Sequence, residues 1–259
     1  MKANVKILLL GVTALAIFAI IFFINSGSDG DGGLVKTADF TALYTPEESD
    51  STANEDAEAR NLAEAEAKPK EPAANQKILF IGDSMLEGLM KRFIDYADQN
   101  NHELQTVVWY SSTTDVWANT DTLQYFMKKF DPSYIVICLG GNELFVRDID
   151  KRKENIKKIV KKFGDTPYVW VSPPNWKDDT GINDAIISVV GKGRYFDSRS
   201  LTLARKADHA HPTDPAAVQW MDTIARWIKS PACDNPLVME WPEKDVSARN
   251  VTMLAPFYR

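Results

Sequence analysis

Cysteine and histidine are scarce in this sequence, which has two Cys and three His among its 259 residues. Cys138 and Cys233 stand far apart, and neither has a partner at the spacing of a structural zinc site, so a fold built on zinc is excluded. A scaffold built on several disulfides is excluded by the same count, although one bridge between the two cysteines is an alternative outside the cytoplasm. We expect Cys138 to be a buried thiol, because it lies within an apolar segment.

An excess of positive charge is also lacking. Residues 25–76 contain 12 acidic and 4 basic side chains, and residues 77–259 carry no net charge. The acidity of the chain therefore belongs to one segment and says nothing about a substrate. Because a neutral domain offers no electrostatic attraction to phosphate backbones, we expect no nucleic-acid partner.

Long apolar runs are absent except near the N-terminus, where Lys2 and Lys6 precede an uncharged run over residues 7–24. As a helix this run is about 27 Å long, close to the thickness of a bilayer. The length favours an uncleaved signal anchor over residues 1–24, with a cleaved signal peptide and a buried core helix as the alternatives. The lysines before the run predict a single-pass, membrane-anchored chain with its bulk outside the cytoplasm, periplasmic or extracellular.

The remaining chain divides by composition. Residues 25–76 are rich in small and acidic residues and read as a low-complexity linker, because such a segment buries too little apolar surface to offset the entropy of ordering. Residues 77–259 form the expected folded domain. Its core is predicted to span 77–229, followed by an irregular, proline-rich tail over 230–259.

Short apolar segments alternate with amphipathic ones throughout the domain core. This alternation predicts an α/β fold with a five-stranded parallel sheet covered by helices on both faces. The strands are expected at 77–81, 105–110, 134–139, 168–172 and 194–196, and the helices at 85–100, 121–130, 151–163, 182–191 and 215–229.

The loops that follow the strands carry the polar residues of interest. In a parallel sheet the carboxyl ends of the strands share one edge, which is where such folds bind ligands. The loops expected at this edge are 82–84, 111–115, 140–143 and 173–176, together with 208–211 where the chain returns.

Three polar residues in these loops have the side chains that acyl transfer needs. Ser84 is a candidate nucleophile at a strand-to-helix turn, His211 is a candidate base, and Asp208 can hold its imidazole. His209 is the rival base. A metal site at 208–211 is disfavoured because no other cluster of ligands accompanies it, and we expect no metal and no cofactor.

Acyl transfer also needs donors for the developing oxyanion. The side-chain amide of Asn142 and the backbone N–H of Ser84 are two candidates, and Ser112 is the best placement for a third. The edge loops also supply candidates for substrate contacts, namely Asp83, Gly141, Asn175 and Trp176.

Gly82-Asp83-Ser84, Gly140-Gly141-Asn142-Glu143 and Asp208-x-x-His211 occur in this order. They resemble blocks I, III and V of the SGNH/GDSL hydrolase family, over residues 77–229. The resemblance implies a flavodoxin-like three-layer α/β/α fold, hydrolysis or transfer of acyl esters, and the roles given above for Ser84, Asn142, Asp208 and His211.

Two positions depart from the family pattern. The segment after the second strand, residues 110–114, lacks the glycine that the family usually places there, so the assignment of Ser112 rests on position alone. Glu143 replaces the commoner aspartate, and we expect little consequence.

The leading functional hypothesis is a membrane-tethered serine esterase that removes acyl groups, O-acetyl groups above all, from a glycan or other cell-envelope polysaccharide. Its partners would be a small acyl ester or acetylated glycan and the membrane. An O-acetyltransferase, a lysophospholipase or thioesterase, and a non-catalytic envelope module of the same fold are the alternatives.

Overall fold

The computed structural model describes residues 70–247 and 249–256. The predicted membrane span and most of the predicted linker lie outside these residues. Within the described ranges, no helix has the length and apolar character needed to cross a membrane.

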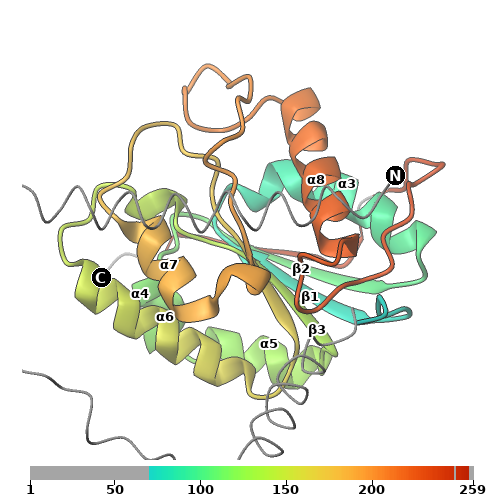
Figure 1. Ribbon diagram of the computed structural model, residues 1–259, viewed down its shortest axis with the longest axis horizontal. Helices are drawn as coiled ribbons and strands as arrows, with labels where there is room; N and C mark the ends of the chain where they lie inside the picture. The colour runs from blue at the N-terminus through green and yellow to red at the C-terminus, as the bar shows by residue number, and fades with distance from the viewer. Residues whose placement is uncertain (1–69, 248, 257–259) are drawn as a thin grey trace, which may run out of the picture. The chain divides into compact units, whose positions relative to one another are not determined.

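The described domain is an α/β structure with one sheet of six parallel strands in the order β5-β4-β3-β1-β2-β6 (Figure 1). The strands are β1 (Lys77–Gly82), β2 (Glu103–Trp109), β3 (Tyr134–Cys138), β4 (Tyr168–Val171), β5 (Tyr195–Phe196) and β6 (Val251–Leu254). The helices are α3 (Leu86–Gln99), α4 (Thr114–Asn119), α5 (Thr122–Phe130), α6 (Ile149–Phe163), α7 (Ile182–Val190) and α8 (Asp214–Lys229), with short 3-10 turns η1 (Gly141–Glu143) and η2 (Lys192–Arg194).

The central strands are buried on both faces, which explains their uninterrupted apolar sequences. In β1, Ile78 and Phe80 belong to the core on one side of the sheet, whereas Leu79 and Ile81 belong to the core on the other. This division follows from the two-residue period of a strand.

Helices cover both faces of the sheet (Figure 1). Helices α3 and α8 pack together on one face, where Phe93 and Trp220 are fully buried. Helices α4 to α7 cover the other face, where Trp117 and Ile156 are fully buried. Two apolar cores therefore sandwich the sheet and fix the edge at which its loops emerge.

The number of strands and the nature of the C-terminal tail were predicted wrongly. The tail contributes β6, which pairs in parallel with β2 and makes a sixth strand. Thr106 N–H donates to Asn250 O at 2.9 Å, and Tyr110 N–H donates to Leu254 O at 3.1 Å. Four residues behind a proline-rich segment carry too short a pattern to predict a strand, and the pairing depends on the open edge of β2. The short helix α4 was missed for the same reason of length.

The chain just before Lys77 is also paired with the tail. Ala73 N–H donates to Pro236 O at 2.8 Å, and Val238 N–H donates to Ala73 O at 3.0 Å. His102 joins the same region, since one ring nitrogen accepts from Gln76 N–H at 3.0 Å and the other lies 2.8 Å from Val238 O. Burial lowers the pKa of His102. This histidine is therefore a structural residue.

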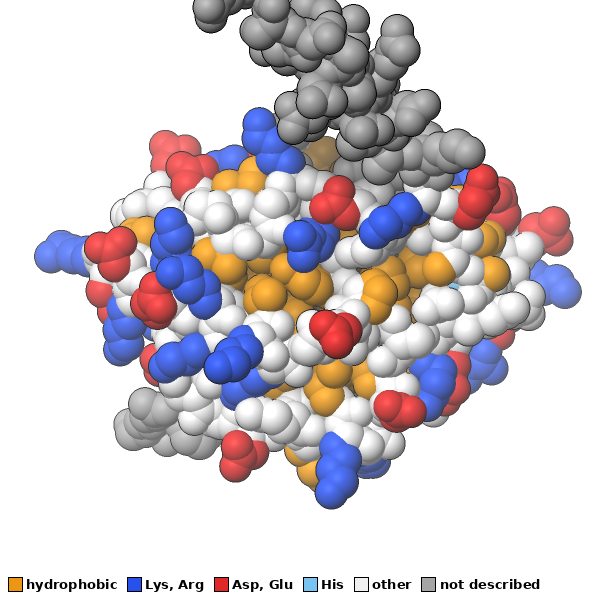
Figure 2. All heavy atoms as spheres, turned by 60° about the horizontal axis from the view of Figure 1, so that its bottom comes forward, with side chains coloured by type: hydrophobic (Ala, Val, Ile, Leu, Met, Phe, Trp, Pro, Cys, Tyr) orange, Lys and Arg blue, Asp and Glu red, His pale blue; other side chains and the backbone are white. Residues whose placement is uncertain are grey.

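Figure 2 shows basic and acidic side chains intermingled over one face of the molecule, with apolar side chains visible between them. Helix α6 is rich in lysine, and several of its lysines have local partners. Lys157 pairs with Glu154 at 2.7 Å, and Lys158 donates to Asn119 Oδ1 at 3.0 Å. These contacts fit a solvated helix surface.

A chain that ends at Arg249 is expected to be less stable by about 3 kcal/mol, because it loses several backbone hydrogen bonds to β2 at about 1 kcal/mol each. It also loses Ala255 O, which accepts from Trp109 Nε1 at 2.9 Å. Urea unfolding followed by circular dichroism measures the change. A chain that ends at Pro256 serves as the control, and equal stability of the two truncated chains would contradict the assigned role of β6.

Candidate active site

Ser84 lies in the turn between β1 and α3, at the carboxyl edge of the sheet. The turn presses against the end of β3. Asp83 N–H donates to Cys138 O at 3.3 Å, and a Cβ on Gly82 would stand 1.9 Å from that same oxygen. Only glycine permits this approach, so the Gly82 position is dictated by packing.

The Asp83 side chain shapes this turn from inside. Its Oδ1 accepts the N–H of Met85 at 2.9 Å, just before the first residue of α3. The other oxygen is buried and has no partner among the described residues. Burial, helped by the nearby charge of Glu143, raises the pKa of Asp83 to about 7. The residue is only 1% exposed, so its side chain presents almost no surface for the substrate contact predicted from the sequence.

The segment 208–211 forms a tight turn around the Asp208 carboxylate. Oδ1 accepts the N–H groups of Ala210 and His211, both at 2.9 Å, and Oδ2 lies 2.7 Å from His211 Nδ1. These hydrogen bonds hold the pKa of Asp208 well below its usual range, and the bond from the N–H of Ala210 has the largest effect. The carboxylate therefore stays ionised and favours the tautomer with a proton on Nδ1.

His211 Nε2 lies 2.9 Å from Ser84 Oγ. With Nδ1 facing Asp208, Nε2 has its lone pair directed at the serine hydroxyl. Ser84, His211 and Asp208 thus form one continuous line of hydrogen bonds from three side chains that the sequence had predicted to meet. The side chain of His209, the rival base, is exposed and makes no hydrogen bond to Ser84. The imidazole in contact with the serine is therefore that of His211.

Asn142 occupies the short turn η1 after β3, within reach of the loop that follows β2. Its Nδ2 donates to Ser112 O at 3.0 Å, which leaves the second hydrogen of the amide for another acceptor. The side chain is exposed at the carboxyl edge of the sheet, as its predicted role requires.

Ser112 does not fit the role predicted for it. Its N–H donates to Trp109 O at 3.1 Å, its Oγ accepts from Trp117 Nε1 at 2.9 Å, and it is 1% exposed. Ser111 fits better. It is exposed, its N–H has no acceptor among the described residues, and its φ of +55° lies in the region that favours glycine. Ser111 therefore occupies a position where glycine would be the least strained residue. It lies one residue before Ser112, the donor predicted from the sequence.

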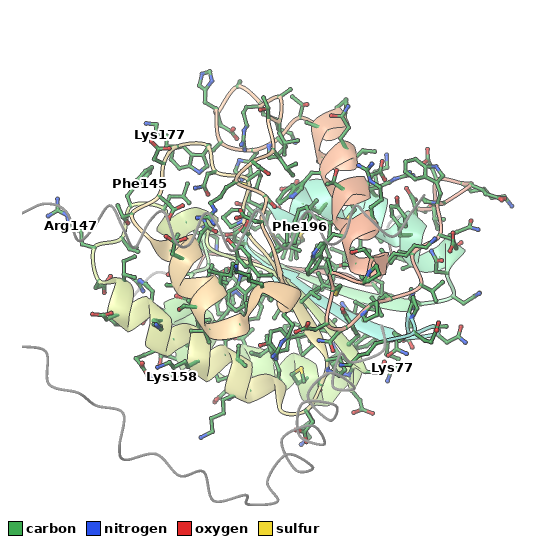
Figure 3. The ribbon with its side chains drawn as sticks, viewed as in Figure 1. Lys77, Phe145, Arg147, Lys158, Lys177 and Phe196 are labelled. Atoms are coloured by element: carbon green, nitrogen blue, oxygen red, sulfur yellow. The ribbon has the colours of Figure 1, made fainter. Side chains whose placement is uncertain are left out.

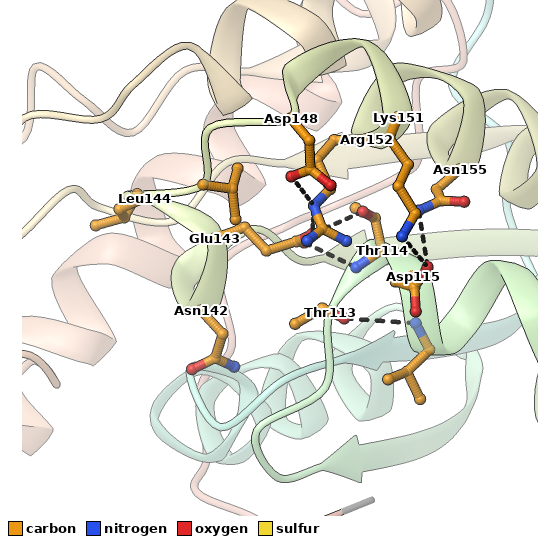
Figure 4. Close-up of polar contacts among 12 residues, drawn as sticks. Thr113, Thr114, Asp115, Asn142, Glu143, Leu144, Asp148, Lys151, Arg152 and Asn155 are labelled. Carbon is orange, nitrogen blue, oxygen red and sulfur yellow. Dashed lines mark hydrogen bonds and ion pairs between the residues drawn. The ribbon is translucent and has the colours of Figure 1, made fainter. Parts of the chain in front are cut away.

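Glu143 has a larger consequence than the sequence suggested (Figure 4). Its two oxygens accept the N–H and the hydroxyl of Thr114, each at 2.7 Å, and Oε1 lies 3.3 Å from Arg152 Nε. Burial raises the pKa of Glu143, while Thr114 and Arg152 oppose the rise. The carboxylate thereby ties the loop after β2 to the turn after β3, and these loops carry Ser111 and Asn142.

Of the other residues predicted to contact a substrate, two are held within the structure and one is accessible. Gly141 is buried, and a Cβ there would lie 3.3 Å from Asp83 Oδ2, so it is a packing residue. Asn175 is tied by its side chain to Asp179 at 2.7 Å and to Asn183 at 3.1 Å, which also assigns it to the loop scaffold.

Trp176 stays a candidate for a substrate contact. It is half-buried, and its ring lies edge-on to the exposed Phe145 at 5.3 Å. Figure 3 shows Phe145 and Lys177 at the end of the sheet opposite Lys77, which begins β1.

Both cysteines are free thiols, so the bridge considered between them is not formed. In the part of the chain that the structure describes, no group of three or more His, Cys, Asp and Glu side chains could hold a metal ion.

A cleft of about 390 Å³ opens beside Ser84. The residues along it include side chains that the sequence did not single out, because exposed residues on separate elements leave no local pattern. Its lining consists of Ser84, Met85, Glu87, Gly88, Tyr110, Ser111, Lys206, Asp208, His211 and Pro212.

No protein-family model matches this chain, and no curated protein is significantly similar to it in sequence.

Replacing Asp83 by Asn is expected to change how stability depends on pH. The ordinary pKa of an aspartate is 3.8, and in the folded chain the pKa of Asp83 is about 7. Between these two pH values the unfolded chain releases the Asp83 proton while the folded chain keeps it. The stability of the wild type therefore falls as the pH rises through this window. The variant lacks this loss and keeps the acceptor for Met85 N–H. It should gain on the order of 3 kcal/mol over the wild type at pH 8 and much less at pH 4.5.

Urea unfolding at the two pH values measures the difference. Asp178→Asn, which removes an exposed carboxylate, controls for the general effect of one charge. The same stability difference between wild type and Asp83→Asn at both pH values would contradict the buried, proton-binding state of Asp83.

Proposed function

We propose that this chain is a serine esterase of the SGNH/GDSL type that cleaves O-acyl esters, O-acetyl esters of a glycan in particular. The observation that carries the proposal is the line from Ser84 Oγ through His211 to Asp208, at 2.9 and 2.7 Å. A hydroxyl, an imidazole and an ionised carboxylate in this order form the arrangement that activates a serine for attack on an ester.

The sheet adds support. Its first five strands follow the order 2-1-3-4-5, the doubly wound order of flavodoxin-like folds, and β6 extends the edge beyond β2. Ser84, Ser111 and Asn142 follow β1, β2 and β3 in turn, so they lie at the edge where such folds place their ligands.

In the proposed reaction, Ser84 Oγ attacks the acyl carbonyl carbon while His211 Nε2 takes the hydroxyl proton. The negative charge that develops on the carbonyl oxygen is stabilised by the N–H groups of Ser84 and Ser111 and by the amide of Asn142. The bond to the alcohol oxygen then breaks, and His211 returns the proton to that oxygen. Water attacks the acyl-serine with His211 again as base, which releases the acid and restores Ser84.

The choice of an acetylated glycan rests on the predicted anchor. A domain tethered outside the cytoplasm meets the O-acetyl groups of envelope polysaccharides. The charged side chains of Glu87, Lys206 and Asp208 are part of the lining of the cleft beside Ser84. Transfer of the acyl group to a sugar hydroxyl would use the same residues, and product analysis separates it from hydrolysis.

A fluorophosphonate probe is expected to label the wild-type domain and to leave Ser84→Ala unlabelled. Hydrolysis of p-nitrophenyl acetate by the variant should fall by a factor on the order of 10⁴ or more. Ser200→Ala, which removes another exposed hydroxyl, is the matched control and should be labelled normally. A folded wild-type domain that the probe does not label would refute the esterase and favour a non-catalytic module.

Asn142→Ala should lower kcat for p-nitrophenyl acetate by about 10²–10³, because one oxyanion donor is lost. KM should change little, since the donor acts on charge that develops in the transition state. Thermal unfolding shows whether losing the bond to Ser112 O has altered the fold. A stable variant with unchanged kcat would remove Asn142 from the mechanism.

A further inference from the structure

A second hollow adjoins the cleft at Ser84. It has a volume of about 520 Å³ and lies between α3 and the start of α8. Glu87, Gly88 and Lys206 line both the cleft and the hollow, so the two lie side by side along α3. Any ester bound at Ser84 with a long alcohol portion therefore has a path along α3.

Gly88 forms part of the lining at the junction. A Cβ at this position would lie 3.0 Å from Ala217 Cβ on α8, so α3 and α8 approach each other closely there. From Leu86 to Asp95, α3 extends about 14 Å, which is longer than an acetyl group or a single sugar requires.

The walls of the hollow carry charges of both signs. Lys206 pairs with Asp214 at 3.0 Å, and Arg92 lies 3.7 Å from Asp95. Arg92 is held further by Asp222 at 2.8 Å. Lys206 and Asp214 are exposed, and covering them with a fatty acyl chain would remove their water without replacing it, which is costly. The carboxylates likewise oppose a polyanion, whereas a neutral chain of hydroxyl groups can both donate to and accept from such walls.

An exposed aromatic ring stands beyond Arg92. The Arg92 guanidinium lies 4.7 Å from the centre of the Trp241 ring, and Tyr96 meets that ring edge-on at 6.2 Å. Trp241 is 60% exposed although these contacts hold it in place. A fixed, exposed indole presents apolar surface against which the C–H face of a sugar can pack.

We propose that the hollow between α3 and α8 binds the further sugars of an extended O-acetylated glycan whose ester lies at Ser84. The inference rests on the proposed esterase function and deepens it, because it makes a chain of several sugars the substrate. Val218, which lines the hollow from α8 and is 37% exposed, is the position from which to block it.

The test compares chemically O-acetylated chitobiose with O-acetylated chitohexaose. The wild type should show kcat/KM for the hexasaccharide at least about tenfold above that for the disaccharide, since added contacts lower the transition-state free energy. Val218→Trp should lower kcat/KM for the hexasaccharide about tenfold more than for p-nitrophenyl acetate. Gln219→Trp places the same ring on the neighbouring exposed position outside the hollow and should change neither.

Trp241→Ala provides a second, independent variant and should raise KM for the hexasaccharide. Equal kcat/KM for the two oligosaccharides, or an equal effect of Val218→Trp on all substrates, would overturn the inference while leaving the esterase intact.

Binding in the absence of catalysis separates the two proposals. Ser84→Ala should bind unacetylated chitohexaose in calorimetry, and adding Val218→Trp should weaken that binding. If the wild type does not hydrolyse p-nitrophenyl acetate but the hexasaccharide still binds, the esterase proposal alone is refuted. Absence of hexasaccharide binding would refute the glycan subsite.

Discussion

The parallel sheet, covered on both faces, is the constraint on which the site depends. Because apolar cores occupy both sides of the strands, polar groups on the central strands find water chiefly at their ends. The carboxyl ends of β1, β2 and β3 share one edge, and the pairing of Gly82 with Cys138 sets the first turn directly against the third strand. This contact brings the loop that carries Ser84 next to the one that carries Asn142.

Three acidic side chains then hold the loops at this edge. Asp83 accepts from Met85, Glu143 accepts from Thr114, and Asp208 accepts from the backbone of its own turn. Two of the three are buried, and burial raises the pKa of both. In the proposed enzyme, this arrangement would orient the oxyanion donors before a substrate arrives.

Much of the fold and of the candidate site could be predicted from local patterns. The strand cores and the main helices lie within a few residues of the expected ranges, and Ser84, Asp208 and His211 meet as expected. One of the errors concerns backbone geometry. Ser112 was preferred to Ser111 because a sequence does not display φ, and the conformation of the turn after β2 decides which N–H is unpaired.

The sequence alone determined the alternation of the first five strands with the longer helices, since apolar periodicity records which faces are buried. It also determined the residue types that can pass a proton. The tertiary structure alone decided that Val251–Leu254 is a strand, that Glu143 joins two loops, and that a hollow lies between α3 and α8. Each of these depends on segments far apart in the chain. Contacts of that kind arise only when packing brings the segments together, so no local pattern encodes them.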